Sequence, residues 1–132
     1  MAWDHARWVG CAKHFPPTGL DDWIVYVART AEGKPRARYR KGMSLEQVEA
    51  IEMSFQIGGR LIWEKPLTER TFYVCLPEMV GASLGEETRF AKVRWGIGGW
   101  VHGYPVTPDE LRRELHKRNP QELEHFLRMA YA

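Results

Sequence analysis

The chain has 132 residues, of which 44% are hydrophobic and 27% charged, and its formal net charge at pH 7 is +2. This is the balance of an ordinary globular protein, and the length suits one domain, residues 1–132, that buries a core without metals or disulfides. The small positive charge argues against an acidic mimic of DNA, and by itself it does not indicate a nucleic-acid-binding protein.

Cysteine content and hydropathy predict the cellular compartment of the protein. The chain has two cysteines, Cys11 and Cys75, which are too few for a disulfide framework, so we expect reduced thiols and a cytoplasmic protein. Residues 1–10 lack the apolar run of a signal peptide, and the longest apolar run, 23–28, is too short to cross a membrane. Six tryptophans predict a dense core, an aromatic binding surface or both.

The first half of the chain predicts a hairpin followed by a helix. Residues 1–9 suit either a strand or a short helix, and the prolines and glycines of 10–22 indicate a loop. The β-branched and aromatic residues of 23–29 predict a strand, which turns at 31–34 and returns as an edge strand at 35–41. Ser44 and Gln47 form a capping box that opens a helix ending at Gly58-Gly59. Helical spacing predicts that one face of this helix points inward, with Glu52 as its polar exception: Leu45, Val48, Ile51, Glu52 and Phe55.

The second half predicts most of the sheet. We expect short strands at 60–64 and 71–76, the latter covered on both faces because its side chains are mostly apolar on both sides. Residues 77–87 are predicted to be a loop, and Gly96 to Gly99 predict the turn of a hairpin between 88–95 and 100–106. If Trp95 pairs with Trp100, one face of this hairpin carries the following side chains: Ala91, Val93, Trp95, Trp100, His102 and Tyr104.

The C-terminal part predicts two helices or one helix broken at Pro120. Thr107-Pro108-Asp109-Glu110 combines an N-cap, a proline at the first helical position and a capping-box glutamate, and Asn119 to Glu122 repeats that start signal. The expected fold is therefore α+β, with a mixed or antiparallel sheet of about five strands. One helix is inserted after the first hairpin, and two C-terminal helices pack on the sheet.

The strongest functional candidate is a group of cations. Residues 34–41 hold five cations in eight positions, and on an extended strand alternate cations share one face, about 6.6–6.8 Å apart. Arginine binds phosphate in a bidentate manner, so this segment and the later hairpin predict a basic surface for a polyanion. Lysines and arginines on an edge strand also prevent aggregation, and that explanation stays open. The candidate nucleic-acid-binding residues are Lys34, Arg36, Arg38, Arg40, Lys41, Lys92 and Arg94.

The aromatic face of the hairpin is the second candidate. Trp95, Trp100 and Tyr104 can stack nucleic-acid bases or contact a protein if they are exposed, and they belong to the core if helices cover them. The sequence does not decide between these two positions.

Other constellations indicate no chemistry. Cys11 and His14 have the spacing of two zinc ligands, but no second pair completes a tetrahedral site, so we expect neither a metal nor a cofactor. Cys75 lies within an apolar strand, which predicts an unreactive thiol, and Cys11 has no identifiable catalytic partner. The i,i+4 pairs Glu114–Arg118 and Glu124–Arg128 indicate solvated helix faces.

These observations predict a small non-catalytic binding module that engages nucleic acid or a nucleoprotein through its basic strand face. One alternative is a protein–protein interaction or inhibitor module, of the kind that phages and mobile elements encode, which would occlude a host complex. Another is a small-molecule-binding protein or an enzyme with a pocket lined by Trp and His. No membrane partner is expected.

Overall fold

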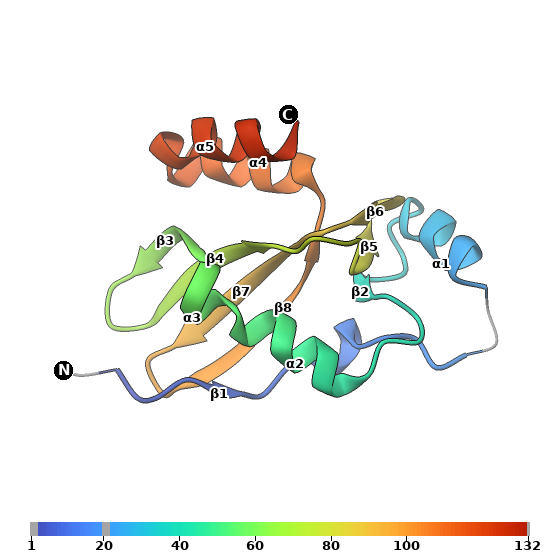
Figure 1. Ribbon diagram of the computed structural model, residues 1–132, viewed down its shortest axis with the longest axis horizontal. Helices are drawn as coiled ribbons and strands as arrows, with labels where there is room; N and C mark the ends of the chain where they lie inside the picture. The colour runs from blue at the N-terminus through green and yellow to red at the C-terminus, as the bar shows by residue number, and fades with distance from the viewer. Residues whose placement is uncertain (1–2, 20–21, 132) are drawn as a thin grey trace.

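The computed structural model describes residues 3–19 and 22–131, and it confirms the α+β class (Figure 1). A five-stranded sheet has the order β1-β8-β7-β4-β3, in which only the β1–β8 pair is parallel, and a three-stranded antiparallel sheet has the order β2-β5-β6. The first half of the chain contains β1 (Arg7–Trp8), η1 (Ala12–His14), α1 (Trp23–Thr30), β2 (Arg38–Tyr39), α2 (Leu45–Met53) and α3 (Phe55–Gly58). The second half contains β3 (Arg60–Lys65), β4 (Glu69–Cys75), β5 (Gly81–Ser83), β6 (Glu86–Thr88), β7 (Phe90–Gly96), β8 (Trp100–Val106), α4 (Pro108–Arg118) and α5 (Pro120–Ala130).

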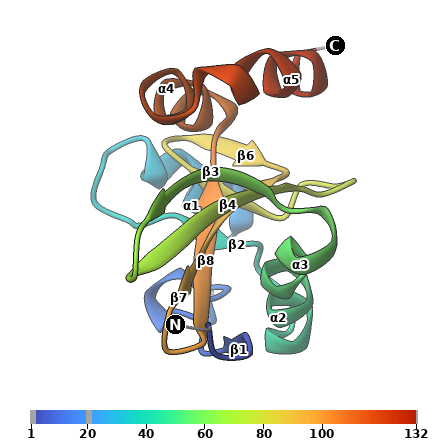
Figure 2. The same cartoon turned by 90° about the vertical axis from the view of Figure 1, so that its left-hand side faces the viewer.

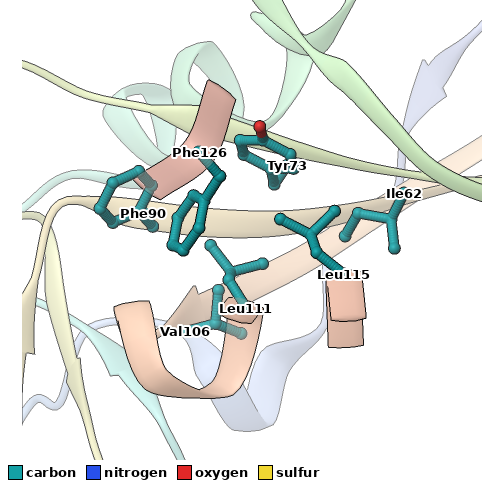
Figure 3. Close-up of a cluster of buried hydrophobic side chains, with 7 residues drawn as sticks. All are labelled: Ile62, Tyr73, Phe90, Val106, Leu111, Leu115 and Phe126. Carbon is teal, nitrogen blue, oxygen red and sulfur yellow. The ribbon is translucent and has the colours of Figure 1, made fainter. Parts of the chain in front are cut away.

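Helices cover the two faces of the large sheet differently. Helices α2 and α3 lie against one face, whereas α4 and α5 lie across one end of the other (Figures 1 and 2). The core under α4 and α5 is shown in Figure 3 and consists of Ile62, Tyr73, Phe90, Val106, Leu111, Leu115 and Phe126. The core under α2 and α3 is built around Phe55, Val74, Ala91, Val93 and Val101. Strand β4 is therefore covered on both faces, as its sequence predicts.

The capping signals of the sequence are confirmed at two helices. Ser44 and Gln47 form a reciprocal capping box at α2, and Thr107 and Glu110 form another at α4. The Asn119 side chain does not cap α5 but donates to the backbone oxygen of Leu61, 3.0 Å away. No helix in the described ranges has the length and hydropathy needed to span a bilayer.

A buried polar cluster joins α2 to the sheet. Glu52 is 1% exposed; it accepts hydrogen bonds from Trp8 Nε1 at 2.8 Å and from the Tyr39 hydroxyl at 2.7 Å. The inward face of α2 is confirmed for Val48, Glu52 and the following Phe55, but Leu45 in the first turn is 50% exposed. Glu52, the polar exception on the inward face of α2, therefore connects α2 to β1 and β2.

The prediction of a strand at 23–29 is wrong, because this segment is helix α1. The Asp22 side chain caps it by accepting from the backbone amide of Ile24. Tyr26 and Thr30 are buried at helical spacing, while Ile24 is 75% exposed. Local capping and one-sided burial therefore override the β propensity of this sequence.

The predicted edge strand at 35–41 is shorter in the structure. Only Arg38–Tyr39 is a strand, and it pairs with β5 inside a segment, 77–87, that the sequence analysis predicted to be a loop. Strands β5 and β6 are only three residues each and are joined by a turn at Leu84 and Gly85, both with positive φ. Such short strands lack the alternation by which longer strands are found.

The hairpin of β7 and β8 is confirmed, but its register differs by one residue from the predicted one. Trp95 pairs with Val101, and Arg94 pairs with His102. The reason is the turn, in which the Gly99 amide donates to the Gly96 carbonyl and Gly99 itself has φ +95°. The glycine in the left-handed region closes a three-residue loop, residues 97–99. Pairing Trp95 with Trp100 would require a four-residue loop, residues 96–99.

Candidate nucleic-acid interface

The register of the hairpin decides which candidate residues lie together. Because side chains alternate along a strand, Trp100, His102 and Tyr104 of β8 lie on the same face as Lys92 and Arg94 of β7. The prediction that these aromatic and basic residues lie on opposite faces is therefore wrong. We call this part of the sheet, beyond the core under α4 and α5, the polar face, consisting of Lys92, Arg94, Trp100, His102 and Tyr104.

Trp95 lies on the other face of the sheet. Its ring packs 5.8 Å from Phe55 and 5.1 Å from Trp3, measured between centroids. It is therefore part of the packing around α3 and does not share a surface with Trp100 and Tyr104.

The two cations of the polar face are paired within the protein. Arg94 makes a bidentate contact with Glu69 of β4, with Nε and Nη2 at 2.9 and 2.8 Å from the two carboxylate oxygens. Lys92 Nζ lies 2.9 Å from both carboxylate oxygens of Glu114 on α4. The Lys92 and Glu114 side chains are only 17% and 21% exposed. Both predicted phosphate contacts are thus largely neutralised by carboxylates of the same chain.

The aromatic side chains of the polar face form two stacked pairs. The Trp100 and His102 rings lie 4.9 Å apart with an interplanar angle of 14°. The His14 ring of η1 stacks on Tyr104 at 4.8 Å and 25°. All four side chains are partly exposed. A Cβ at Gly96 would overlap the Trp100 indole, so the glycine makes room for that ring.

His14 joins the polar face to the basic segment. Its Nδ1 lies 2.6 Å from the backbone oxygen of Ala37, and since a carbonyl only accepts, Nδ1 carries the hydrogen. This contact holds residues 36–38 beside η1. From the sequence, His14 was a possible zinc ligand or pocket residue, whereas its stacking on Tyr104 depends on a tertiary contact that no local pattern encodes.

Positive charge gathers around the two histidines. Burial lowers the pKa of His14 below its usual value, and Lys13, Arg36 and Arg38 lower it further, against the hydrogen bond to Ala37. Burial also lowers the pKa of His102, as do Arg94, His14 and Lys13, against the opposing effect of Glu69. The surroundings of both imidazoles therefore favour the neutral form.

The cations of 34–41 differ in their surroundings. Arg36 is exposed and Arg38 partly so, and neither forms an ion pair within the described ranges 3–19 and 22–131. Arg40 has only a 4.0 Å contact with Glu87, and both side chains are well exposed. Arg36 and Arg38, unlike Lys92 and Arg94, are available to an anionic partner.

The other candidate groups are the two cysteines, the metal-ligating side chains and the helical ion pairs. In the part of the chain that the structure describes, no group of three metal-ligating side chains comes together, and both cysteines are free. Burial raises the pKa of the Cys75 thiol, and the nearby Arg89 guanidinium offsets only part of that. Of the two predicted helical pairs, Glu124–Arg128 forms, while Glu114 binds Lys92 and the Arg118 guanidinium lies over the Trp63 ring.

Comparisons of the chain with family models, curated proteins and solved structures find no match. Its own residues are therefore the basis for a functional proposal.

Proposed function

We propose that the protein is a non-catalytic module that binds single-stranded nucleic acid on the polar face and the adjoining cations Lys13, Arg36 and Arg38. In this proposal the cations contact backbone phosphates, and the partly exposed rings of Trp100 and Tyr104 contact bases. Proteins that bind single strands without sequence preference combine these two elements, a basic groove and aromatic rings.

One observation carries the proposal. His14 stacks on Tyr104 of β8 and contacts the backbone of Ala37, which brings Arg36 and Arg38 close to the rings of the polar face; neither arginine forms an ion pair among the described residues. The phosphate contacts of this surface differ from the predicted set, because Lys92 and Arg94 act mainly as internal ion pairs that hold β7 against β4 and α4. Their contribution to binding is expected to be smaller than that of Arg36 and Arg38.

A second candidate function is binding to a protein. A cavity of about 410 Å³ on the opposite side of the sheet is lined by aromatic and polar residues, namely Phe55, Gln56, Gly59, Phe72 and Trp95. The neighbouring Ile57 is 96% exposed, and among the described side chains only Trp95 has a buried polar atom, Nε1, with no hydrogen-bond partner. Clustered aromatic residues are typical of the energetic centres of protein interfaces.

The test is the binding of a fluorescent oligothymidylate of about 12 nucleotides, measured by anisotropy in salt from about 50 to 200 mM. We expect that Arg36→Glu with Arg38→Glu abolishes binding. In the milder Arg36→Gln/Arg38→Gln variant the slope of log affinity against log salt should fall by about 1.4, two contacts at about 0.7 each.

The matched control is Arg112→Gln/Arg128→Gln, which makes the same change in net charge. Both arginines are exposed on α4 and α5 and pair within their own helices. If the control weakens binding as much as the double change at Arg36 and Arg38, only net charge attracts the oligonucleotide. Oligonucleotide binding that is insensitive to salt and lost in Phe72→Ala would place the strand at the cavity on the other side of the sheet and contradict the proposal.

A further inference from the structure

The turn between β5 and β6 presents an exposed leucine in an unfavourable backbone conformation. Leu84 has φ +48°, in the left-handed region, and it is 53% exposed. A bulky side chain is disfavoured in that region, whereas glycine and asparagine adopt it readily. The turn is held in place, because the Gly85 amide donates to the Thr30 hydroxyl of α1 at 2.6 Å. A leucine at this position therefore lowers the stability of the turn and gains only part of the free energy of burial.

Leu84 lines a cavity that continues the polar face toward α4. The cavity has a volume of about 310 Å³, and its wall includes Lys92 and Tyr104 of the polar face. Helix α4 contributes charged side chains to the wall, among them Arg113 and Glu114. This volume is at the lower end of the range for small-ligand pockets, about 300–1,000 Å³.

The charges of the cavity wall favour a neutral group over a phosphate. Lys92 Nζ lies 2.9 Å from both carboxylate oxygens of Glu114. The Arg113 guanidinium donates to the Asp109 carboxylate at 3.2 Å. Both cations of the wall are thus paired with carboxylates of the same chain, and a phosphate would meet a wall without net positive charge.

We infer that this cavity takes up one nucleobase of the bound strand, which packs on Leu84 and Tyr104; the inference rests on the proposed function. The bases of a single strand are free to turn out of the stack and to pack on aromatic side chains. His14 covers one face of the Tyr104 ring, which leaves the remaining surface of that ring for the base. The contact with the base offsets the unfavourable backbone of Leu84, as is typical of residues that are kept for binding.

The experiment compares oligothymidylate of about 12 nucleotides with a strand of the same length that carries abasic sugars throughout, by anisotropy at low salt. Leu84→Asn should weaken the binding of oligothymidylate about fivefold, because the base buries the exposed part of the leucine side chain. It should leave the affinity for the abasic strand within about twofold of the wild type, because that strand is held through its phosphates alone. Leu84→Met keeps an apolar side chain and should bind both strands as the wild type does.

The matched control is Leu67→Asn, the same change at a second exposed leucine with a positive φ, +59°, in the turn between β3 and β4. Leu67 does not line the cavity, so this variant should bind oligothymidylate as tightly as the wild type. Loss of affinity in Leu84→Asn cannot come from unfolding if its melting temperature rises, which the relief of the unfavourable backbone predicts.

Unchanged oligothymidylate affinity in Leu84→Asn, or an equal loss in Leu67→Asn, would overturn the inference while the proposed function stands. An equal loss of affinity for the abasic strand would also overturn it, because Leu84 would then act on the backbone of the strand. If oligothymidylate does not bind the wild-type protein at low salt, the proposed function and the inference both fail.

Discussion

Replacement of Glu52 by alanine tests the buried polar cluster that joins α2 to the sheet. The carboxylate accepts from the Trp8 indole and from the Tyr39 hydroxyl, and the Tyr39 side chain is fully buried. Removing the acceptor leaves these two side-chain donors without a partner, at about 1–3 kcal/mol each. The buried carboxyl is itself costly, so we expect a net loss of about 3 kcal/mol in the free energy of unfolding.

Urea denaturation followed by circular dichroism measures this loss. The control is Glu49→Ala, at an exposed position of the same helix, which should change stability by less than about 0.5 kcal/mol. Glu52→Gln keeps one acceptor oxygen and should lie between the two. Equal denaturation midpoints for Glu52→Ala and the wild type would refute the view that this carboxyl joins α2 to the sheet.

The pH dependence of stability tests the same cluster. Burial raises the pKa of Glu52 above its usual value of 4.5, although hydrogen bonds from Trp8, Tyr39 and the Gly103 backbone offset part of the rise. The folded state therefore holds the proton that the unfolded state releases above this pH. This contribution is complete below pH 4.5 and is lost as pH rises through the raised pKa. Glu52→Gln should show less loss over that interval, and an identical profile would contradict the assignment.

Three further predictions concern the hairpin glycines, the backbone strain at Leu84 and the titration of the two histidines. Gly96→Ala should destabilise the protein by about 1–3 kcal/mol in urea denaturation because its Cβ would overlap Trp100, whereas Gly98→Ala, whose Cβ would lie 3.8 Å from that ring, should have little effect. Leu84→Asn should stabilise the protein by about 1 kcal/mol, read as a higher melting temperature, because Leu84 is 53% exposed and has φ +48°. In the free protein the pKa values of His14 and His102 are lowered, and a bound phosphate should raise them. Binding then takes up protons, so nucleic-acid affinity should increase as pH falls from about 8 to 5. His14→Gln/His102→Gln should flatten the pH profile of the anisotropy titration; a profile equally steep in that variant would assign the dependence to other groups.

The sequence predicted correctly those helices and turns whose ends are defined by neighbouring residues. Ser44 with Gln47 and Thr107 with Glu110 are capping boxes within four residues, and the glycines at 96–99 mark the hairpin turn. The segment 23–29 was predicted to be a strand because its composition is rich in β-branched and aromatic residues. The one local sign of a helix is Asp22, which caps α1.

The candidate site was less predictable because it depends on contacts between distant residues. Arg94 and Glu69 are 25 positions apart and Lys92 and Glu114 are 22 apart, so the sequence could not show that these cations are paired. A one-residue change of register moved Trp100 and Tyr104 from the expected face to the one that carries Lys92 and Arg94. Arg36 and Arg38 were identified from charge alone, whereas the role of His14 required the fold.

The central claim is that the polar face and the adjoining cations form one binding surface, and a ¹H–¹⁵N titration tests it most directly. The protein is titrated with oligothymidylate of about 12 nucleotides while the Trp indole signals and the backbone amides are followed. We predict that the Trp100 indole and the amides of 13–14, 36–38 and 100–104 shift together, and that the Trp95 indole does not. Shifts confined to Trp95, Phe55 and Phe72, or no shifts at low salt, would contradict the claim.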